Sequence, residues 1–434
     1  MLTKKQTKLF VLSCLLLLLL NLSLLAAGIL DPNFGNGGKI ILNLGATVDS
    51  IGAAILQPDG KIIIAGSTFP SNSTISFADF AVVRLNADGS LDGTFGNGGF
   101  VTTDFTGGQD GATSVALLPD GKIIAAGYAQ TPLVSNSRRT VYAMVRYNSN
   151  GSLDTSFGTG GKVHSDFGAG YYRISKLLIQ SDGKIIAFGS APGDSFAIPA
   201  RIGLTRYNAD GGIDSSFGAN GRMFIRFNGA GRFTEGTFFR DAAIQPDGKI
   251  IITGNAEVLI PGCVSSMTVN CVTLQSFMFR YAPQMFPDRK FGRRLGKEYG
   301  DINHFWSVFL QSDGKIVIGG NNVKRYWANG RIDRLFSPPI VSNVNFKIDS
   351  IAERQNRNLV GCGTLDTSST SRDVAIASFD ENGGLIGTDL QNFAATEKCN
   401  SVLVQTDNKI LMFGDTLGSR NSKIFIVRYL DIAP

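Results

Sequence analysis

The sequence predicts an all-β protein: a seven-bladed β-propeller of four-stranded antiparallel blades, with the ring closed by the N-terminal strand joining the last blade. The first observation is a repeated turn and strand, which begins as Q-P-D-G-K-I-I-I-A-G at residues 57–66. Its Asp or Asn recurs at Asp59, Asp120, Asp182, Asp247, Asp313, Asn356 and Asp407, in steps of 61, 62, 65, 66, 43 and 51 residues. Repeats of this length indicate an array of similar structural units.

Each unit contains four short strand signals separated by Gly, Asp and Asn turns. In the first unit they cover residues 50–57, 61–65, 80–86 and 100–105. The turn at Pro58-Asp59-Gly60 suits a hairpin, because Pro presets φ and Gly accepts a positive φ. Strands that are apolar at successive positions must be covered on both faces. Seven small sheets of this kind are expected to stack around an axis.

The two ends of the chain are complementary. Residues 30–39 resemble the end of a repeat unit without the strands that should precede it, and residues 425–431 finish a unit that lacks this end. The N-terminal strand is therefore expected to complete the last blade, which removes two exposed sheet edges.

The first 27 residues are predicted to be a signal peptide, and residues 28–434 the propeller. Lys4, Lys5 and Lys8 precede an apolar segment at 9–25, and small residues follow at Ala26 and Ala27. An uncleaved anchor is the alternative, since about 17 apolar residues is close to the minimum for a bilayer. We expect a secreted, periplasmic or cell-surface monomer without membrane contact after cleavage. The net charge of +6 includes no Lys/Arg run longer than three, which argues against nucleic acid.

Four cysteines follow the signal segment, and three disulfide connectivities are possible. Cys263 and Cys271 flank a short loop, so we expect them to pair; the pairing of Cys362 and Cys399 stays open. None of the four has the spacing of a metal site, and no cofactor is expected.

The full unit is an apolar strand, Q-P-D-G-K-I-I-x-x-G, a loop, and F-x-x-x-R-Y-N-x-D-G-x-L-D-x-x-F-G-x-x-G. It resembles the bacterial delta-60 repeat, a propeller-forming repeat of exported proteins. The resemblance covers residues 30–431 and is strongest in the first four units. It implies a layout similar to NHL-type propellers, which mostly bind other molecules, and it supplies no catalytic motif.

The Asp of L-D-x-x-F-G recurs at Asp31, Asp92, Asp154, Asp214 and Asp333. A cation site needs several oxygens converging on one ion, whereas this Asp is alone in its motif. We expect its carboxylate to accept backbone N–H bonds in the turn, with the following Phe filling the space between blades. The Asp-Gly-Lys turn is likewise expected to connect two strands of a β-hairpin. It is not expected to bind phosphate, since no helix follows it.

Candidate ligand contacts come from aligning the units on the turn Asp. Nine residues before it stand Ser50, Gly111, Arg173, Phe238, His304, Lys347 and Lys398, and seven before it stand Gly52, Thr113, Ser175, Arg240, Trp306, Asp349 and Asn400. In a propeller the first strand lines the axis, so these residues should ring one mouth of the channel beside the most irregular loops. The candidates are Arg138, Arg139, Tyr172, Arg173, Phe238, Arg240, His304, Trp306, Lys347 and Lys398.

This aromatic and basic set suits carbohydrate stacking or an acidic partner. We therefore favour an extracellular binding module for a glycan or a protein. One alternative is a polysaccharide lyase or hydrolase at the same mouth, using His304, Arg240, Asp241 and Asp349 as acid/base groups. Another is a purely structural surface protein.

Overall fold

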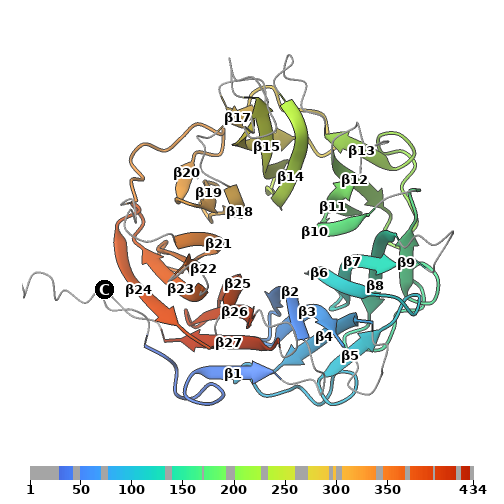
Figure 1. Ribbon diagram of the computed structural model, residues 1–434, viewed down its shortest axis with the longest axis horizontal. Coiled ribbons are helices and arrows are strands. Elements are labelled where there is room, and N and C mark those ends of the chain that lie inside the picture. Colours follow the sequence, from blue (N-terminus) through green and yellow to red (C-terminus); the bar gives the residue numbers. More distant parts are fainter. Residues whose placement is uncertain are drawn as a thin grey trace, which may run out of the picture.

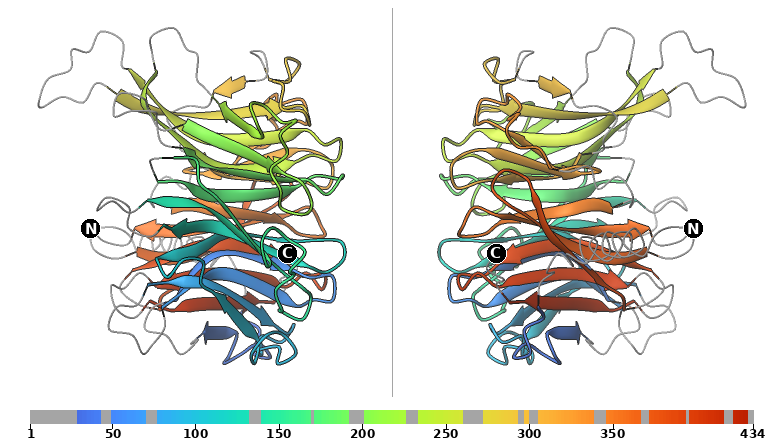
Figure 2. Two further views of the ribbon diagram at one scale, coloured as in Figure 1. Left: turned by 90° about the vertical axis from the view of Figure 1, so that its right-hand side faces the viewer. Right: turned by 90° about the vertical axis from the view of Figure 1, so that its left-hand side faces the viewer.

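The computed structural model describes residues 29–42, 49–69, 77–131, 139–168, 171–191, 201–225, 233–259, 272–292, 297–299, 305–338, 346–366, 372–393, 396–416 and 422–430. These residues form seven antiparallel sheets arranged as a ring (Figure 1). Side views show the sheets stacked around the axis (Figure 2). The predicted fold is confirmed: a seven-bladed β-propeller. No helix within the described ranges is long and apolar enough to cross a membrane. The predicted signal segment, residues 1–27, lies outside these ranges.

The strands follow the repeat units in order. Blade 1 contains β2 (Asp49–Leu56), β3 (Ile62–Thr68), β4 (Asp79–Leu85) and β5 (Phe100–Thr103). Blade 2 contains β6 (Asp110–Leu117), β7 (Ile123–Gln130), β8 (Thr140–Tyr147) and β9 (Lys162–Ser165). Blade 3 contains β10 (Arg173–Ile179), β11 (Ile185–Ala191), β12 (Arg201–Tyr207) and β13 (Arg222–Ile225). Blade 4 contains β14 (Phe233–Ile244), β15 (Ile250–Leu259), β16 (Val272–Tyr281) and β17 (Lys297–Tyr299).

Blades 5 and 6 come from the eroded repeats. Blade 5 has three strands within the described residues: β18 (Phe305–Leu310), β19 (Ile316–Gly320) and β20 (Lys324–Tyr326). Blade 6 contains β21 (Phe346–Glu353), β22 (Leu359–Asp366), β23 (Arg372–Phe379) and β24 (Leu385–Gln391). Strand β24 forms where the sequence motif is nearly lost, because strand pairing requires only backbone groups and a packed face.

Blade 7 confirms the predicted closure of the ring. It contains β25 (Glu397–Val404), β26 (Ile410–Thr416) and β27 (Ile424–Tyr429), and its fourth strand is β1 (Lys39–Leu42) from the start of the chain. Strand β1 pairs antiparallel with β27, with Lys39 opposite Val427 and Leu42 opposite Ile424. In Figure 1 the first and last segments of the chain lie side by side in this blade.

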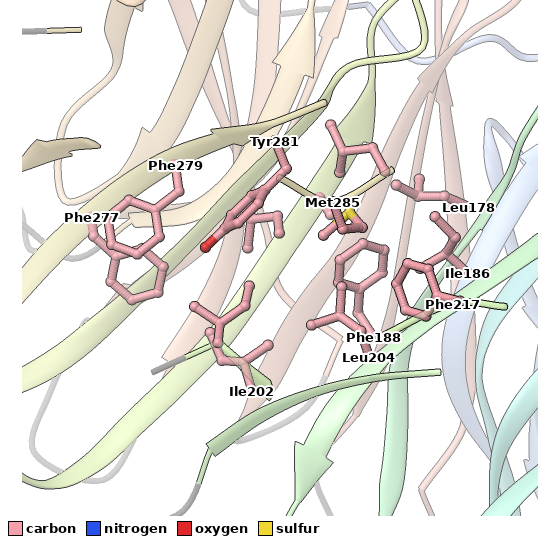
Figure 3. Close-up of a cluster of buried hydrophobic side chains, with 14 of the residues drawn as sticks. Leu178, Ile186, Phe188, Ile202, Leu204, Phe217, Phe277, Phe279, Tyr281 and Met285 are labelled. Atoms are coloured by element: carbon pink, nitrogen blue, oxygen red, sulfur yellow. The ribbon is translucent and has the colours of Figure 1, made fainter. Parts of the chain in front are cut away.

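The hydrophobic core is divided among the blade interfaces. Seven clusters of buried side chains occur within the described residues, one between each pair of neighbouring blades. Successive residues of β3 serve opposite interfaces: Ile62 and Ile64 pack toward blade 7, whereas Ile63 and Ala65 pack toward blade 2. Figure 3 shows the cluster between blades 3 and 4, with Phe188 and Phe217 facing Met285. Coverage of both faces explains the continuous apolar strands.

The Asp of the L-D-x-x-F-G motif forms a buried cluster that the sequence predicts only in part. As expected, Oδ1 of Asp92 accepts a hydrogen bond from the backbone N–H of Thr94, at 3.0 Å. Its Oδ2 also pairs with Nε of Arg84 at 2.7 Å and Nζ of Lys61 at 3.0 Å. The Arg84 guanidinium lies 4.7 Å from the ring centroid of Phe95. The carboxylate is therefore engaged in contacts that hold the blade together.

The same Arg–Asp pair recurs in other blades. It joins Arg146 to Asp154, Arg206 to Asp214, Arg280 to Asp288, Arg325 to Asp333 and Arg428 to Asp31. Hydrogen bonds with the turn residues and the nearby cations outweigh burial, and so hold the pKa of Asp92, Asp154 and Asp214 well below the usual carboxyl range.

One disulfide joins Cys362 on β22 to Cys399 on β25, linking blades 6 and 7. Both cysteines are fully buried. The expected Cys263–Cys271 bridge lies outside the described residues.

Candidate functional site at the bulge ring of the channel

The first strand of every blade lines the central axis and carries a β-bulge near its entrance (Figure 1). A β-bulge places one extra residue in a strand and re-aims its side chain. The extra residues are Gly52, Thr113, Ser175, Arg240, Trp306, Asp349 and Asn400. We call them the bulge ring. They are the residues seven places before the turn Asp or Asn of each unit. Residues that are equivalent in the aligned repeats therefore occupy the same bulge position in every blade.

Side chains of the bulge ring reach toward the following blade. The Asn400 side-chain amide donates to the carbonyl oxygen of Ile51 at 2.7 Å, and the Thr113 hydroxyl donates to the carbonyl of Ile174. A Cβ added to Gly52 would lie 2.3 Å from the carbonyl oxygen of Ala112, so this position has no room for a side chain. Blades 1 to 3 thus carry small bulge residues, whereas blades 4 to 7 carry large or polar ones.

Arg240 is the cation of the bulge ring in blades 4 to 7, where the bulge residues are large or polar. Its guanidinium stacks on the Trp306 ring at 4.1 Å from the centroid and lies 5.9 Å from the Phe238 ring. Burial lowers the pKa of Arg240, and the charge of Asp349 opposes this effect. Its Nε is buried and has no hydrogen-bond partner among the described residues. A buried donor without a partner costs free energy unless a ligand or water supplies the acceptor.

Asp349 lies among three cations of the same mouth. Burial raises its pKa to about 6, while a hydrogen bond from Thr364 and the charges of Lys398, Lys347 and Arg240 oppose the rise. The Thr364 hydroxyl donates to Oδ2 of Asp349 at 3.1 Å. Three cations therefore face a carboxyl group whose own ionisation is disfavoured, so the local charge is positive near pH 6.

A second carboxylate, Asp415 on β26, borders the same mouth. Burial raises its pKa, opposed by the charge of Lys398 and by a hydrogen bond from Ser50, whose hydroxyl lies 3.1 Å from Oδ2. Two further atoms are buried without a partner among the described residues, Oδ1 of Asp415 and Oδ1 of Asn400. Within the described part of the chain, the mouth therefore offers one unsatisfied donor in blade 4 and two unsatisfied acceptors in blade 7, groups to which a polar ligand could bind.

The structure brings together five of the ten sequence candidates. Phe238, Arg240, Trp306, Lys347 and Lys398 share this mouth, while Arg138 and His304 lie outside the described residues. Arg173 is exposed and lies over Tyr128 at 5.1 Å, and Arg139 pairs with Asp166 at 2.6 Å. Tyr172 is only 8% exposed and packs edge-on against Tyr142 and Phe167 in the core between blades 2 and 3.

Two site residues were absent from that candidate set. Asp349 belongs to the bulge ring and entered only the enzyme alternative. Asp415 is on the second strand, opposite Lys398, and only the strand register shows it. Asp241, which the enzyme alternative also used, is engaged structurally: it pairs with Lys176 at 2.9 Å and accepts the Val308 N–H at 3.0 Å.

A cavity of about 910 Å³ lies at the other end of the strands, among the Asp-Gly-Lys turns of blades 2 to 5. Aliphatic side chains such as Leu117, Ile179, Ile244 and Leu310 line it. The cavity and the bulge ring do not coincide. We place the candidate site at the bulge ring because charged side chains gather there and because single buried atoms of Arg240 and Asp415 have no hydrogen-bond partner among the described residues. The cavity walls, in contrast, are largely aliphatic.

Three carboxylates also meet between blades 1 and 2, where strands β4 and β6 begin and β5 ends. Atoms of Asp79, Asp104 and Asp110 all lie within 4.8 Å of one another. Burial and the neighbouring charges of Asp104 and Asp79 raise the pKa of Asp110 to about 7, while hydrogen bonds from the backbone of Phe105 and Gln130 oppose the rise. This carboxyl group is therefore partly protonated near neutral pH, which relieves the repulsion in the cluster.

Fold and repeat together define the class of protein, a seven-bladed propeller built from sequence repeats. Residues 57–95, 118–157, 180–217 and 311–336 match a family described as a "domain of unknown function (DUF5122) beta-propeller". These segments are similar to a propeller repeat family, in agreement with the predicted repeat. No curated protein matches the chain.

Three solved structures align with most of the chain. One is a polysaccharide lyase of a new family, PL25, described as an ulvan lyase: it is 10% identical, the match covers 89% of this chain and 96% of that one, and the TM-score is 0.50. Another is a GH93 α-L-arabinofuranosidase of Fusarium graminearum, at 11% identity, 93% and 97% coverage and TM-score 0.45. A third, of unknown function, is from Dyadobacter fermentans, at 10% identity, 92% and 100% coverage and TM-score 0.45. At these identities the likeness concerns the fold alone.

Proposed function

We propose that the protein is a binding module that holds an acidic glycan at the bulge-ring mouth of its channel. The observation that carries this proposal is Arg240, a half-buried cation that is stacked on Trp306 and has a buried Nε without a hydrogen-bond partner among the described residues. Stacking on an aromatic ring fixes the guanidinium plane, which leaves its edge available to a carboxylate or sulfate.

Neighbouring charges support an acidic ligand. Lys347 and Lys398 add two cations, and the pKa of Asp349 is raised to about 6 by burial. An incoming carboxylate would therefore meet a positive mouth. Phe238, 42% exposed beside Arg240, offers an apolar surface of the kind on which sugar rings stack.

We also propose that this site operates outside the cytoplasm. The predicted signal segment and the buried Cys362–Cys399 disulfide support this location, because disulfides persist in oxidising compartments.

The test is isothermal titration of the protein with a polyuronate, and with a neutral glucan of similar length for comparison. We expect the polyuronate to bind and the Arg240→Gln variant to bind roughly ten- to a hundredfold more weakly, as expected for loss of a hydrogen bond to a charged group. Trp306→Leu should weaken binding as well, because Arg240 then loses its support. Arg289→Gln, which removes one exposed positive charge at the opposite end of the strands, is the matched control.

Two outcomes would overturn the proposal. If wild type and Arg240→Gln are both folded and bind the polyuronate with equal affinity, the bulge ring is excluded as the binding site. Shortened polysaccharide chains recovered after incubation would show cleavage, and would favour an enzyme over a binding module.

A further inference from the structure

The sequences of blades 4 and 5 differ from the repeat at a second surface. The differences lie in the turn after the third strand and in the Asp motif that follows this turn. In blades 1 and 2 the residue after the turn Gly is Ser90 or Ser152, and the two residues after the motif Asp are Gly93-Thr94 or Thr155-Ser156. In blade 4 these positions hold Phe286 and Arg289-Lys290, and in blade 5 they hold Arg331 and Arg334-Leu335. Small neutral residues are thus replaced by cations and large apolar groups.

The backbone of these turns nevertheless keeps the repeat geometry. The N–H of Ala282 donates to the Phe286 carbonyl at 2.8 Å, and that of Trp327 to the Arg331 carbonyl at 2.8 Å, as in the other blades. Met285 even adopts a φ of 65° where other turns have Gly. A non-glycine residue in this conformation is uncommon. The scaffold is therefore retained while its outward side chains differ.

The large apolar side chains of these turns are exposed to solvent, although such side chains are usually buried. Phe286 is 72% exposed, Leu335 79% and Trp327 45%. Arg331 and Arg334 are exposed beside them and form no ion pair with the described residues. Clustered apolar side chains that are rimmed by charges mark interaction surfaces, since such groups gain free energy when they leave water.

The two turns form one continuous surface. The N–H of Gly292 in blade 4 donates to the Asn329 carbonyl in blade 5 at 2.8 Å, and Gly330 lies against the ring of Phe291. Gly292, Arg331, Ile332 and Arg334 line a hollow of about 430 Å³. We define the blade 4–5 turn surface as Phe286, Lys290, Trp327, Arg331, Arg334 and Leu335.

We propose that the blade 4–5 turn surface binds a bilayer that carries anionic phospholipids. Arg331 and Arg334 flank a hollow that suits a phosphate headgroup, and their charges complement an anionic leaflet. Phe286 and Leu335 protrude from turns, a shape suited to insertion between headgroups, whereas a soluble polyanion would make no use of them. This surface differs from the bulge ring in position and chemistry. Membrane binding here would depart from the expectation that the mature chain makes no membrane contact.

The test is co-sedimentation of the full-length mature protein with vesicles of phosphatidylcholine, alone or mixed with phosphatidylglycerol. We expect binding only to the mixed vesicles, weakened by added salt. The Arg331→Gln/Arg334→Gln variant should lower the partition coefficient roughly thirtyfold, the product of two lost charges near an anionic surface. The Phe286→Ser/Leu335→Ser variant should also lower it, and both variants should melt like the wild type because the changed side chains are exposed.

A control variant loses the same number of positive charges from the opposite face of the propeller, at the bulge-ring mouth. Lys347→Gln/Lys398→Gln removes the same two charges from the bulge-ring mouth and should leave vesicle binding unchanged. Absence of wild-type binding to the mixed vesicles at low salt would overturn the proposal. So would equal losses from both charge variants, since net charge alone would then explain the binding. Retention on an immobilised acidic protein without vesicle binding would assign the surface to an acidic protein partner and would equally overturn it.

Discussion

Nη2 of Arg428 lies 2.8 Å from Oδ2 of Asp31, so an ion pair joins the last strand of the chain to the segment that precedes its first strand. Both side chains are almost fully buried. In blade 1 the same pair, Arg84 and Asp92, lies within one continuous segment. The ring is therefore closed by an interaction that other blades use internally.

Replacing Asp31 should destabilise the protein and also release its N-terminal segment. Asp31→Ala leaves Arg428 buried without its partner, a change that costs about 3 kcal/mol or more. Asp92→Ala removes the equivalent carboxylate and should cost a similar amount, measured by denaturant unfolding. Only Asp31→Ala should make residues 29–42 sensitive to limited proteolysis. Equal protease resistance of the two variants would show that β1 remains docked without this pair.

The sequence predicted the blades, their number and the closure, because these follow from the repeat period and from the complementary chain ends. It did not predict the Arg–Asp pair, although the signal was present: Arg84 precedes Asp92 by eight residues, and four other units keep this spacing. The bulges were not predictable, because strands that are apolar at every position give no alternation that an extra residue would interrupt.

Site residues could be predicted only where they occupy an equivalent position in each repeat unit, nine or seven residues before the turn Asp. Arg240 and Trp306 share such a position, so their proximity follows from the ring. The position of Asp415 depends on which residue of β26 faces Lys398, which is a matter of register. The Cys362–Cys399 bridge likewise joins strands of different blades, and sequence spacing says nothing about the distance between them.

Removing the disulfide should lower stability without opening the native ring. Cys362 and Cys399 are 37 positions apart in the sequence, so on the chain-entropy model the bridge raises the free energy of the unfolded chain by about 4 kcal/mol. Cys362→Ala/Cys399→Ala should therefore unfold at lower denaturant concentration, while its near-UV circular dichroism stays native. Peptide mass mapping without reduction should recover the Cys362–Cys399 pair from the wild type. Free thiols at both positions would contradict the bridge.

Asp349 should make the protein less stable as the pH rises. Its pKa in the folded state is about 6, above the ordinary value of 3.8, so between these values the folded protein binds a proton that the unfolded chain has lost. The contribution is fully present below pH 4 and is lost as the pH rises through 6, on the order of 2–3 kcal/mol. Asp349→Asn should therefore be more stable than wild type at pH 7.5 and equal to it at pH 3.5, in paired thermal melts. Parallel stability curves across this range would contradict the raised pKa.

Protonation of Asp349 should also raise the affinity for an acidic ligand. As the pH falls through about 6, Asp349 loses its negative charge and leaves Lys347, Lys398 and Arg240 less compensated. A polyuronate remains largely ionised at pH 5, since free carboxyl groups titrate near pH 4. Its affinity, measured by isothermal titration, should therefore be higher at pH 5 than at pH 7. In Asp349→Asn the affinity should already be high at pH 7 and should change little with pH; an unaltered pH dependence in this variant would assign the titration to another group.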